Sequence, residues 1–285
     1  AGGAVSTGIR NTLIGGSAGD SLTTGSYNVA VGYEALSTEN TTGRNVAIGY
    51  QALTTQNAGA DAYNVAVGFY AGQLLTTGTS NNLIGGSAGA ALTDGSNHIA
   101  IGRSALSNAQ SDSNCIAIGY GALGQLNGSG TSYNVAIGHL AGENMQTGTH
   151  NILIGGLVAP DLDGTENVVI GYKALGAASN DTENVAIGYE ALVDQDGGEM
   201  STAVGWKAGH ANISGTPLVF IGHSAGLLVT GGDDLCFIGA SAGGALDYTG
   251  RNLVCLGNSA QPSAVGVSDE LTLGSSGIAT LRCAV

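Results

Sequence analysis

The chain has 285 residues, of which 50 are Gly, 43% are hydrophobic and only 10% are charged. Seven Lys and Arg against 21 Asp and Glu give a formal net charge of −14. Nucleic-acid binding needs clustered cations that neutralise phosphates, so this composition argues against nucleic acid as a partner. The sequence also contains no run of 18 apolar residues, and we therefore expect no membrane insertion.

The chain begins with a Gly-rich lead-in, residues 1–10, that contains no complete repeat. A motif typified by Asn45–Leu53 then recurs over residues 11–274, mostly at intervals of 17 residues. A short fixed period predicts a solenoid, in which each coil buries its apolar side chains against its neighbours. Aligned on one glycine, the motif recurs at Gly15, Gly32, Gly49, Gly68, Gly85, Gly102, Gly119, Gly138, Gly155, Gly171, Gly188, Gly205, Gly222, Gly239, Gly257 and Gly274.

Each coil contains one candidate strand just before its aligned Gly. The residue preceding the Gly is aliphatic, as in Val31, and the residue two positions earlier is mostly β-branched, as in Val29. Between them lies a small apolar residue, most often Ala, so both faces of the strand are apolar. The expected fold is an all-β parallel β-solenoid, or β-roll, of about sixteen 17-residue coils.

Two exchanges of volume between coils suggest shared spaces in the core. Coils with Leu in the middle of the strand have Gly after the aligned Gly, whereas coils with Ala there mostly carry a large residue, as in Ala30 and Tyr33. We infer that these two positions fill one space and that the chain bends at the Gly. Some coils have Leu four residues after the Gly, and others have Gly there and a Leu or another large apolar residue three positions later. We expect these two side chains to fill the same slot in the core.

One apolar strand per coil leaves a long apolar face on a single chain. Soluble monomers avoid such patches, whereas three parallel copies around an axis would cover it. We therefore expect a homotrimer. The longer intervals place extra residues at 56–60 and 127–130, where they should bulge on the turn side without disturbing the stack.

The Asn-Val-Ala-Ile-Gly core, as in Asn45–Gly49 and Asn184–Gly188, resembles the coil motif of trimeric autotransporter adhesin heads. The full coil, with Tyr-x-Ala-Leu and Thr-Thr-Gly, is similar to repeats in tail fibres and appendages of tailed bacteriophages. Residues 270–285 resemble the segment that leads into the C-terminal intramolecular chaperone of such fibres. The resemblance implies a homotrimeric fibre on the virion, with residues 275–285 preceding a removed or omitted chaperone domain.

The aromatic residues that follow the aligned Gly are candidate receptor contacts. We expect them to pack structurally or, alternatively, to form a surface ladder that stacks sugar rings. The recurrent Asn should form an amide ladder with structural function. Asp161–Glu166 resembles the start of a calcium loop but lacks its other ligands and is expected to be a turn, so no metal or cofactor is predicted. The candidate contacts are Tyr33, Tyr50, Phe69, Tyr172, Tyr189 and Trp206.

No order of nucleophile, base and orienting acid is recognisable, so we expect no enzyme. The leading hypothesis is a structural and adhesive fibre protein, the trimeric shaft or tip of a phage tail fibre that binds a host surface receptor such as a glycan. The alternative is a bacterial surface adhesin of the trimeric autotransporter kind. An ice-binding solenoid, suggested by Thr pairs such as Thr23-Thr24 and Thr76-Thr77, and a depolymerase are less favoured.

Overall fold

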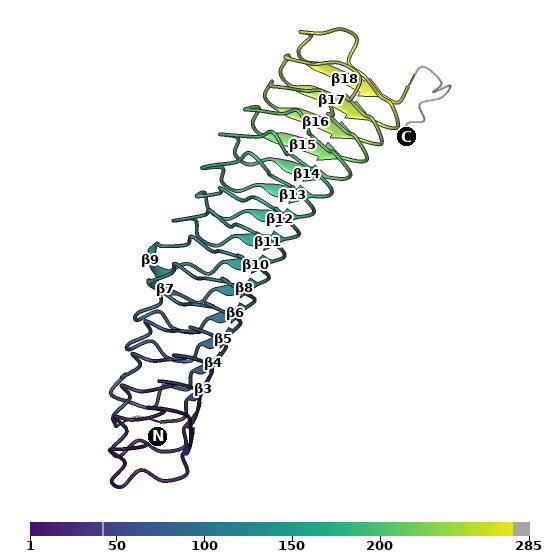
Figure 1. Ribbon diagram of the computed structural model, residues 1–285. Helices are drawn as coiled ribbons and strands as arrows, with labels where there is room; N and C mark the ends of the chain where they lie inside the picture. Colours follow the sequence, from purple (N-terminus) through teal and green to yellow (C-terminus); the bar gives the residue numbers. More distant parts are fainter. Residues whose placement is uncertain (42, 276–285) are drawn as a thin grey trace, which may run out of the picture. The chain divides into compact units, whose positions relative to one another are not determined.

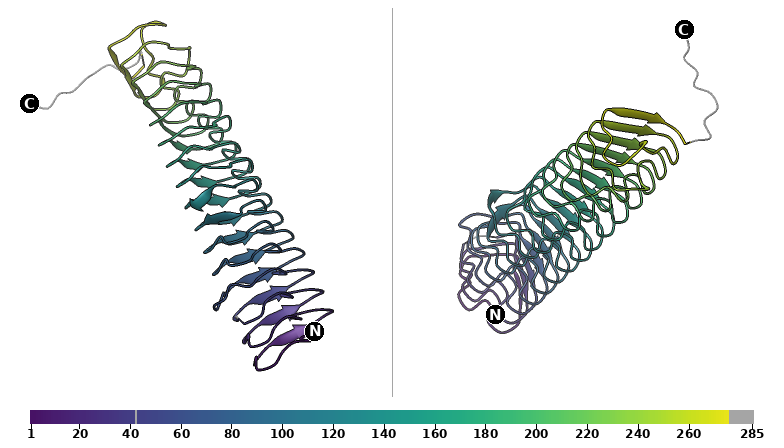
Figure 2. Two further views of the ribbon diagram at one scale, coloured as in Figure 1. Left: turned by 90° about the vertical axis from the view of Figure 1, so that its left-hand side faces the viewer. Right: turned by 90° about the horizontal axis from the view of Figure 1, so that it is seen from above.

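The computed structural model describes residues 1–41 and 43–275, which divide into two compact units, unit 1 up to Asn151 and unit 2 from Ile152 onward. No described residue is helical. In each unit, short strands lie side by side, one per coil, and wide loops connect them (Figure 1). Figure 2 shows that the loops of each coil return the chain to the same side, where the next strand begins beside the previous one. The prediction of an all-β parallel solenoid with coils of about 17 residues is confirmed.

Unit 1 contains a main parallel sheet in the order β1-β2-β3-β4-β5-β6-β8-β10. The strands pair in a constant register that places the middle residues on one another, as in Ala30 on Ala47. The strands of this sheet are β1 (Thr12–Ile14), β2 (Val29–Val31), β3 (Val46–Ile48), β4 (Val65–Val67), β5 (Asn82–Ile84), β6 (Ile99–Ile101), β8 (Ile116–Ile118) and β10 (Val135–Ile137).

The insertions in unit 1 leave this register intact, as predicted. Ala47 still pairs with Ala66 across the first, and Ala117 with Ala136 across the second. The second insertion forms part of β9 (Ser129–Thr131), which pairs in parallel with β7 (Ser111–Ser113) in a separate two-stranded sheet on the turn side. Extra residues therefore extend the turn side rather than shifting the main sheet.

Unit 2 repeats the arrangement in the order β11 to β18. Its last four strands are one residue longer than the others. The strands are β11 (Ile152–Ile154), β12 (Val168–Ile170), β13 (Val185–Ile187), β14 (Thr202–Val204), β15 (Leu218–Ile221), β16 (Leu235–Ile238), β17 (Leu253–Leu256) and β18 (Glu270–Leu273).

The aligned Gly ends the strand of each coil in a conformation that other residues rarely adopt. Gly49 has a φ of +138°, well beyond the small left-handed region open to L-residues. A Cβ on Gly49 would also lie 2.6 Å from the carbonyl carbon of Gly68 in the next coil. Both the chain reversal and the close approach of successive coils therefore require Gly, which confirms the predicted bend.

The residue four positions after the aligned Gly also has a positive φ. Leu36, with a φ of +51°, and Gly72, with a φ of +57°, represent the two solutions. The left-handed conformation costs Leu about 1–2 kcal/mol, which complete burial of its side chain, at about 1.5–3 kcal/mol, offsets. Gly avoids the strain, and Leu75, three residues later, fills the core instead.

The predicted common slot is thus confirmed, with one exception. The alternative residues Leu22, Leu75, Leu92, Met145 and Val229 are all fully buried. Leu246 is 50% exposed, so that assignment was wrong. Tyr248 is buried in this coil, with its ring centroid 6.4 Å from that of Phe237, and the larger side chain removes the need for Leu246.

The inferred sharing of space between the middle of the strand and the residue after the Gly is also wrong. Ala30 lies in the core, whereas Tyr33 is 50% exposed on the outside of the coil. A large residue in the middle of the strand instead occupies space that is left free where the residue four positions after the aligned Gly is small. A Cβ on Gly19 would lie 2.8 Å from Cδ2 of Leu13.

The recurrent Asn connects coils through the main chain rather than through amide-to-amide bonds. The backbone N–H of Asn45 donates to Oδ1 of Asn28 at 3.0 Å, and that of Asn64 donates to Oδ1 of Asn45 at the same distance. The Asn64 amide donates to the carbonyl oxygen of Gly78 at 2.8 Å. Each Asn therefore satisfies buried backbone groups, a structural role as predicted, although the partners differ from those of an amide ladder.

His98 replaces Asn in one coil and reproduces both of its hydrogen bonds. Its Nδ1 accepts from the backbone N–H of Cys115 at 3.3 Å, and its Nε2–H donates to the carbonyl oxygen of Asp112 at 2.7 Å. This pattern requires the neutral imidazole, because a protonated Nδ1 cannot accept. Burial holds the pKa of His98 below its usual value.

We expect His98 to make unit 1 sensitive to acid. Because its pKa is lowered by folding, its contribution to stability is complete above the unfolded pKa of about 6.5 and is lost as the pH falls towards the folded value. In His98→Asn the decrease in thermal midpoint between pH 7 and pH 5, measured by circular dichroism, should be smaller than in the wild type. His150→Asn, a change at an exposed histidine, is the control. An unchanged pH dependence in His98→Asn would contradict this role.

The described cysteines Cys115, Cys236 and Cys255 are free thiols. Cys255 is a small core residue, and burial raises its pKa to about 11. Cys236 aligns with Val219 and Val254 on the outer face of the strands and is only partly buried. Cys236 therefore lies outside the core.

Candidate functional site

The outer side of each coil is formed by alternate residues around its strand. In the second coil these are Tyr27, Val29, Val31 and Tyr33, whereas Asn28 and Ala30 point into the core. We call the first and third residues of the three-residue strands of the main sheet, together with the residues aligned with them in its longer strands, the apolar face. Its members are half-buried or exposed, and Ile48 and Ile101 retain 38% and 37% exposure. Each unit therefore has an uncovered face of Val and Ile, as the sequence predicted for a single chain.

The residues that follow the aligned Gly form an exposed aromatic column beside the apolar face. In unit 1, Tyr33, Tyr50 and Phe69 stack with ring centroids 5.5 and 5.3 Å apart and interplanar angles of 17° and 18°. In unit 2, Tyr172 and Tyr189 stack at 5.6 Å. Trp206 continues this run and stacks on His223 at 4.6 Å. All six candidate residues are between 40% and 54% exposed, so they form a surface ladder rather than part of the core.

This stacking determines which ring faces a ligand could reach. Tyr50 has Tyr33 on one face and Phe69 on the other, so only its edge and hydroxyl group are open. A sugar ring needs a free aromatic face, which the ladder offers only where a run of rings ends. Each such end lies beside a coil that lacks a ring at this position.

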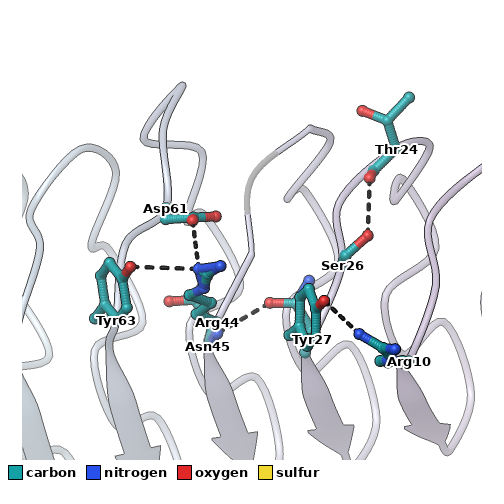
Figure 3. Close-up of polar contacts among 9 residues, drawn as sticks. Arg10, Thr24, Ser26, Tyr27, Arg44, Asn45, Asp61 and Tyr63 are labelled. Atoms are coloured by element: carbon teal, nitrogen blue, oxygen red, sulfur yellow. Dashed lines mark hydrogen bonds and ion pairs between the residues drawn. The ribbon is translucent and has the colours of Figure 1, made fainter.

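A second exposed column, which the sequence analysis missed, consists of the residues that precede the recurrent Asn. Figure 3 shows Arg10, Tyr27, Arg44 and Tyr63 alternating in successive coils of unit 1. The guanidinium carbons of Arg10 and Arg44 lie 5.2 and 5.3 Å from the centroid of Tyr27. Arg44 also forms an ion pair with Asp61 at 2.8 Å and donates to the Tyr63 hydroxyl at 3.3 Å.

The scarce cations of the chain are concentrated on aromatic rings. Of the six described Lys and Arg residues, all except Arg251 lie over a Tyr or Trp ring. Such contacts contribute about 0.5–1 kcal/mol each at exposed sites. The signal available in the sequence was that Arg10, Tyr27, Arg44 and Tyr63 occupy one repeat position.

The aromatic column of unit 2 carries a charged cluster. Glu190 Oε2 lies 3.0 Å from Lys207 Nζ and 3.2 Å from His210 Nε2. The hydrogen bond from Lys207 is the main cause that lowers the pKa of Glu190. Nearby, Lys173 lines a shallow open pocket of about 370 Å³ together with Leu157, Pro160, Gly176, Ala177, Val193 and Asp194.

The remaining sequence-based candidates do not add to these columns. Asp161–Glu166 lies in the connection between β11 and β12, and no cluster of three His, Cys, Asp or Glu gathers in residues 1–41 and 43–275. Thr23 and Thr76 donate their hydroxyl groups to carbonyl oxygens of the next coil, at 3.3 and 2.8 Å, so these Thr are not a free array. Residues 276–285, including most of the predicted C-terminal segment and Cys283, lie outside the described residues, as does Thr42.

The repeats, the register and the exposed columns define this chain as a parallel β-solenoid repeat protein. Comparisons of the chain with protein-family models, with curated proteins and with solved structures find no match. Among the described residues, no helix is long and apolar enough to cross a membrane.

Proposed function

We propose that the protein is the trimeric shaft or tip of a virion appendage of the tail-fibre kind, which attaches a particle to a host surface. The observation that carries this proposal is the apolar face, which runs beside exposed aromatic and Arg–Tyr columns within unit 1. A monomer in water would leave this face uncovered at a cost in solubility.

Parallel copies related by rotation about an axis along the strand stack would cover it. In such an assembly every coil meets the same coil of its partners, so one short strand motif suffices for the entire interface. Three copies are the arrangement of both families that the coil resembles. The aromatic and Arg–Tyr columns flank the apolar face, and they would lie at the edges of the interface, where three copies present them repeatedly and increase avidity.

Two measurements test this function. Sedimentation equilibrium of the purified chain should give three times the mass of 27.9 kDa, and the labelled trimer should bind cells of a host bacterium. A monomer at micromolar concentration would contradict the assembly. A stable trimer that binds none of a broad panel of bacterial surfaces would contradict the attachment function.

A further inference from the structure

The aromatic column of unit 1 is interrupted at Gly86. The aligned residues of three successive coils are Phe69, Gly86 and Arg103, and the strands before them pair Val67 with Ile84 and Ile84 with Ile101. The backbone keeps its regular spacing across the interruption, because Ser87 N–H donates to the Phe69 carbonyl at 2.8 Å and Ser104 N–H to the Gly86 carbonyl at 2.9 Å. Gly86 therefore leaves a gap in the column between the Phe69 ring and the Arg103 side chain.

The missing ring leaves a slot between Phe69 and Arg103. At a strand separation of about 4.8 Å, these two residues are two coils, or about 9.6 Å, apart. A Cβ on Gly86 would meet only Cγ of Arg103 at 3.9 Å and the carbonyl oxygen of Phe69 at 4.0 Å, both ordinary contacts. At Gly16, which ends the same run of rings, a Cβ would instead lie 3.2 Å from Cδ2 of Tyr33. The slot at Gly86 is thus the more open of the two.

Both walls of the slot are held in place from behind. Phe69 stacks on Tyr50 at 5.3 Å and contacts Tyr70 at 4.0 Å between ring centroids, while its side chain remains 54% exposed. The Arg103 guanidinium carbon lies 4.7 Å from the centroid of Tyr120, whose ring stacks on His139 at 5.4 Å. Fixed walls reduce the entropy lost on binding.

Arg103 has a charge that the described residues do not neutralise. Arg44 and Arg251 each form an ion pair with an Asp, whereas Arg103 has no carboxylate within reach among residues 1–41 and 43–275. An exposed guanidinium binds a carboxylate through two parallel N–H donors. A free aromatic face binds the C–H face of a pyranose ring.

We propose that the slot between Phe69 and Arg103 binds one acidic sugar of a surface polysaccharide, a hexuronate. The sugar ring takes the place of the missing aromatic ring on Phe69, and its carboxylate pairs with Arg103. This assignment rests on the proposed attachment function and specifies a receptor chemistry for it. The slot suits an isolated carboxylate rather than nucleic acid, in which each strand of a duplex carries one phosphate per about 3.4 Å of helix axis.

The test is a titration of the protein with methyl glucuronide, with methyl glucoside and with benzoate in separate experiments, in which saturation-transfer NMR measures binding. Methyl glucuronide should bind about tenfold or more tightly than methyl glucoside, because a charge-assisted hydrogen bond is lost with the neutral sugar. Arg103→Gln should reduce glucuronide binding to the level of glucoside, whereas Arg251→Gln, at an ion pair in unit 2, should not. Benzoate that bound as tightly as glucuronide would overturn the assignment to a sugar.

Gly86→Tyr provides a second variant that should fold. Tyr occupies the same position in other coils, as in Tyr50, and Gly86 has no positive φ that would exclude a side chain. The new ring should fill the gap beside Phe69, abolish glucuronide binding and leave the thermal midpoint unchanged or higher. Unchanged glucuronide binding in Gly86→Tyr, or no glucuronide binding by the wild type, would overturn the slot. If the wild type still bound host cells in that case, the attachment function would stand without it.

Discussion

Gly49→Ala should destabilise unit 1 by about 3 kcal/mol or more, the upper range for a residue forced into a sparsely populated backbone conformation. Its φ of +138° is unfavourable for any L-residue, and its Cβ would press against the backbone of Gly68 rather than against a side chain that can move. For a unit of about 150 residues, this loss corresponds to a decrease of roughly 10 °C in the thermal midpoint. Circular dichroism melting of the whole chain measures it.

The matched control is Gly86→Ala in the same unit. Its Cβ would meet only ordinary contacts near 4 Å, and Gly86 lacks a positive φ. Its thermal midpoint should therefore differ little from that of the wild type. Equal midpoints for the Gly49 and Gly86 variants would show that neither conformation nor close approach explains the aligned Gly.

Replacing Ile48 and Ile101 together by Glu should dissociate the trimer proposed above into monomers. Both side chains point outward from their strands and keep 38% and 37% exposure in the single chain, so each coil can still fold. In the proposed assembly three new carboxylates would be buried near one another at each of the two levels without partners, a cost of several kcal/mol at each position. Sedimentation equilibrium should give the mass of one chain, with an unchanged far-ultraviolet spectrum.

The control for this variant carries the same added charge elsewhere. Ser21 and Thr24 are exposed on the turn side, and replacing both by Glu should leave the trimer intact. If both variants remained trimeric, the interface would have to lie outside the apolar face. Dissociation by both pairs would instead point to general charge repulsion.

Much of the fold could be predicted from the repeat alone. The aligned Gly, the aliphatic residues before it and the Asn at the start of each coil recur so regularly that strand position, register and parallel order followed. The tolerance of insertions at 56–60 and 127–130 followed as well, because an unbroken repeat on either side fixes the register.

The direction of side chains was harder to predict. The positions of Ala30 and Tyr33 vary inversely in size along the chain, yet one lies in the core and the other on the surface, because the bend at Gly32 lies between them. The positive φ shared by Leu36 and Gly72 was not predicted, because Leu is not expected in this conformation. Burial of the Leu side chain offsets the strain, so Leu can occupy the position. The Arg10–Tyr27 contact was missed because ring and cation come from different coils.

The constant register has a consequence for the gene. Where successive coils join through the same Asn bonds and the same pairing of strands, removing or copying one coil's worth of codons in frame would bring together two surfaces that already fit. Recombination between the repeats could then lengthen or shorten the protein without inventing a new contact. Natural isolates should accordingly differ in size by whole coils.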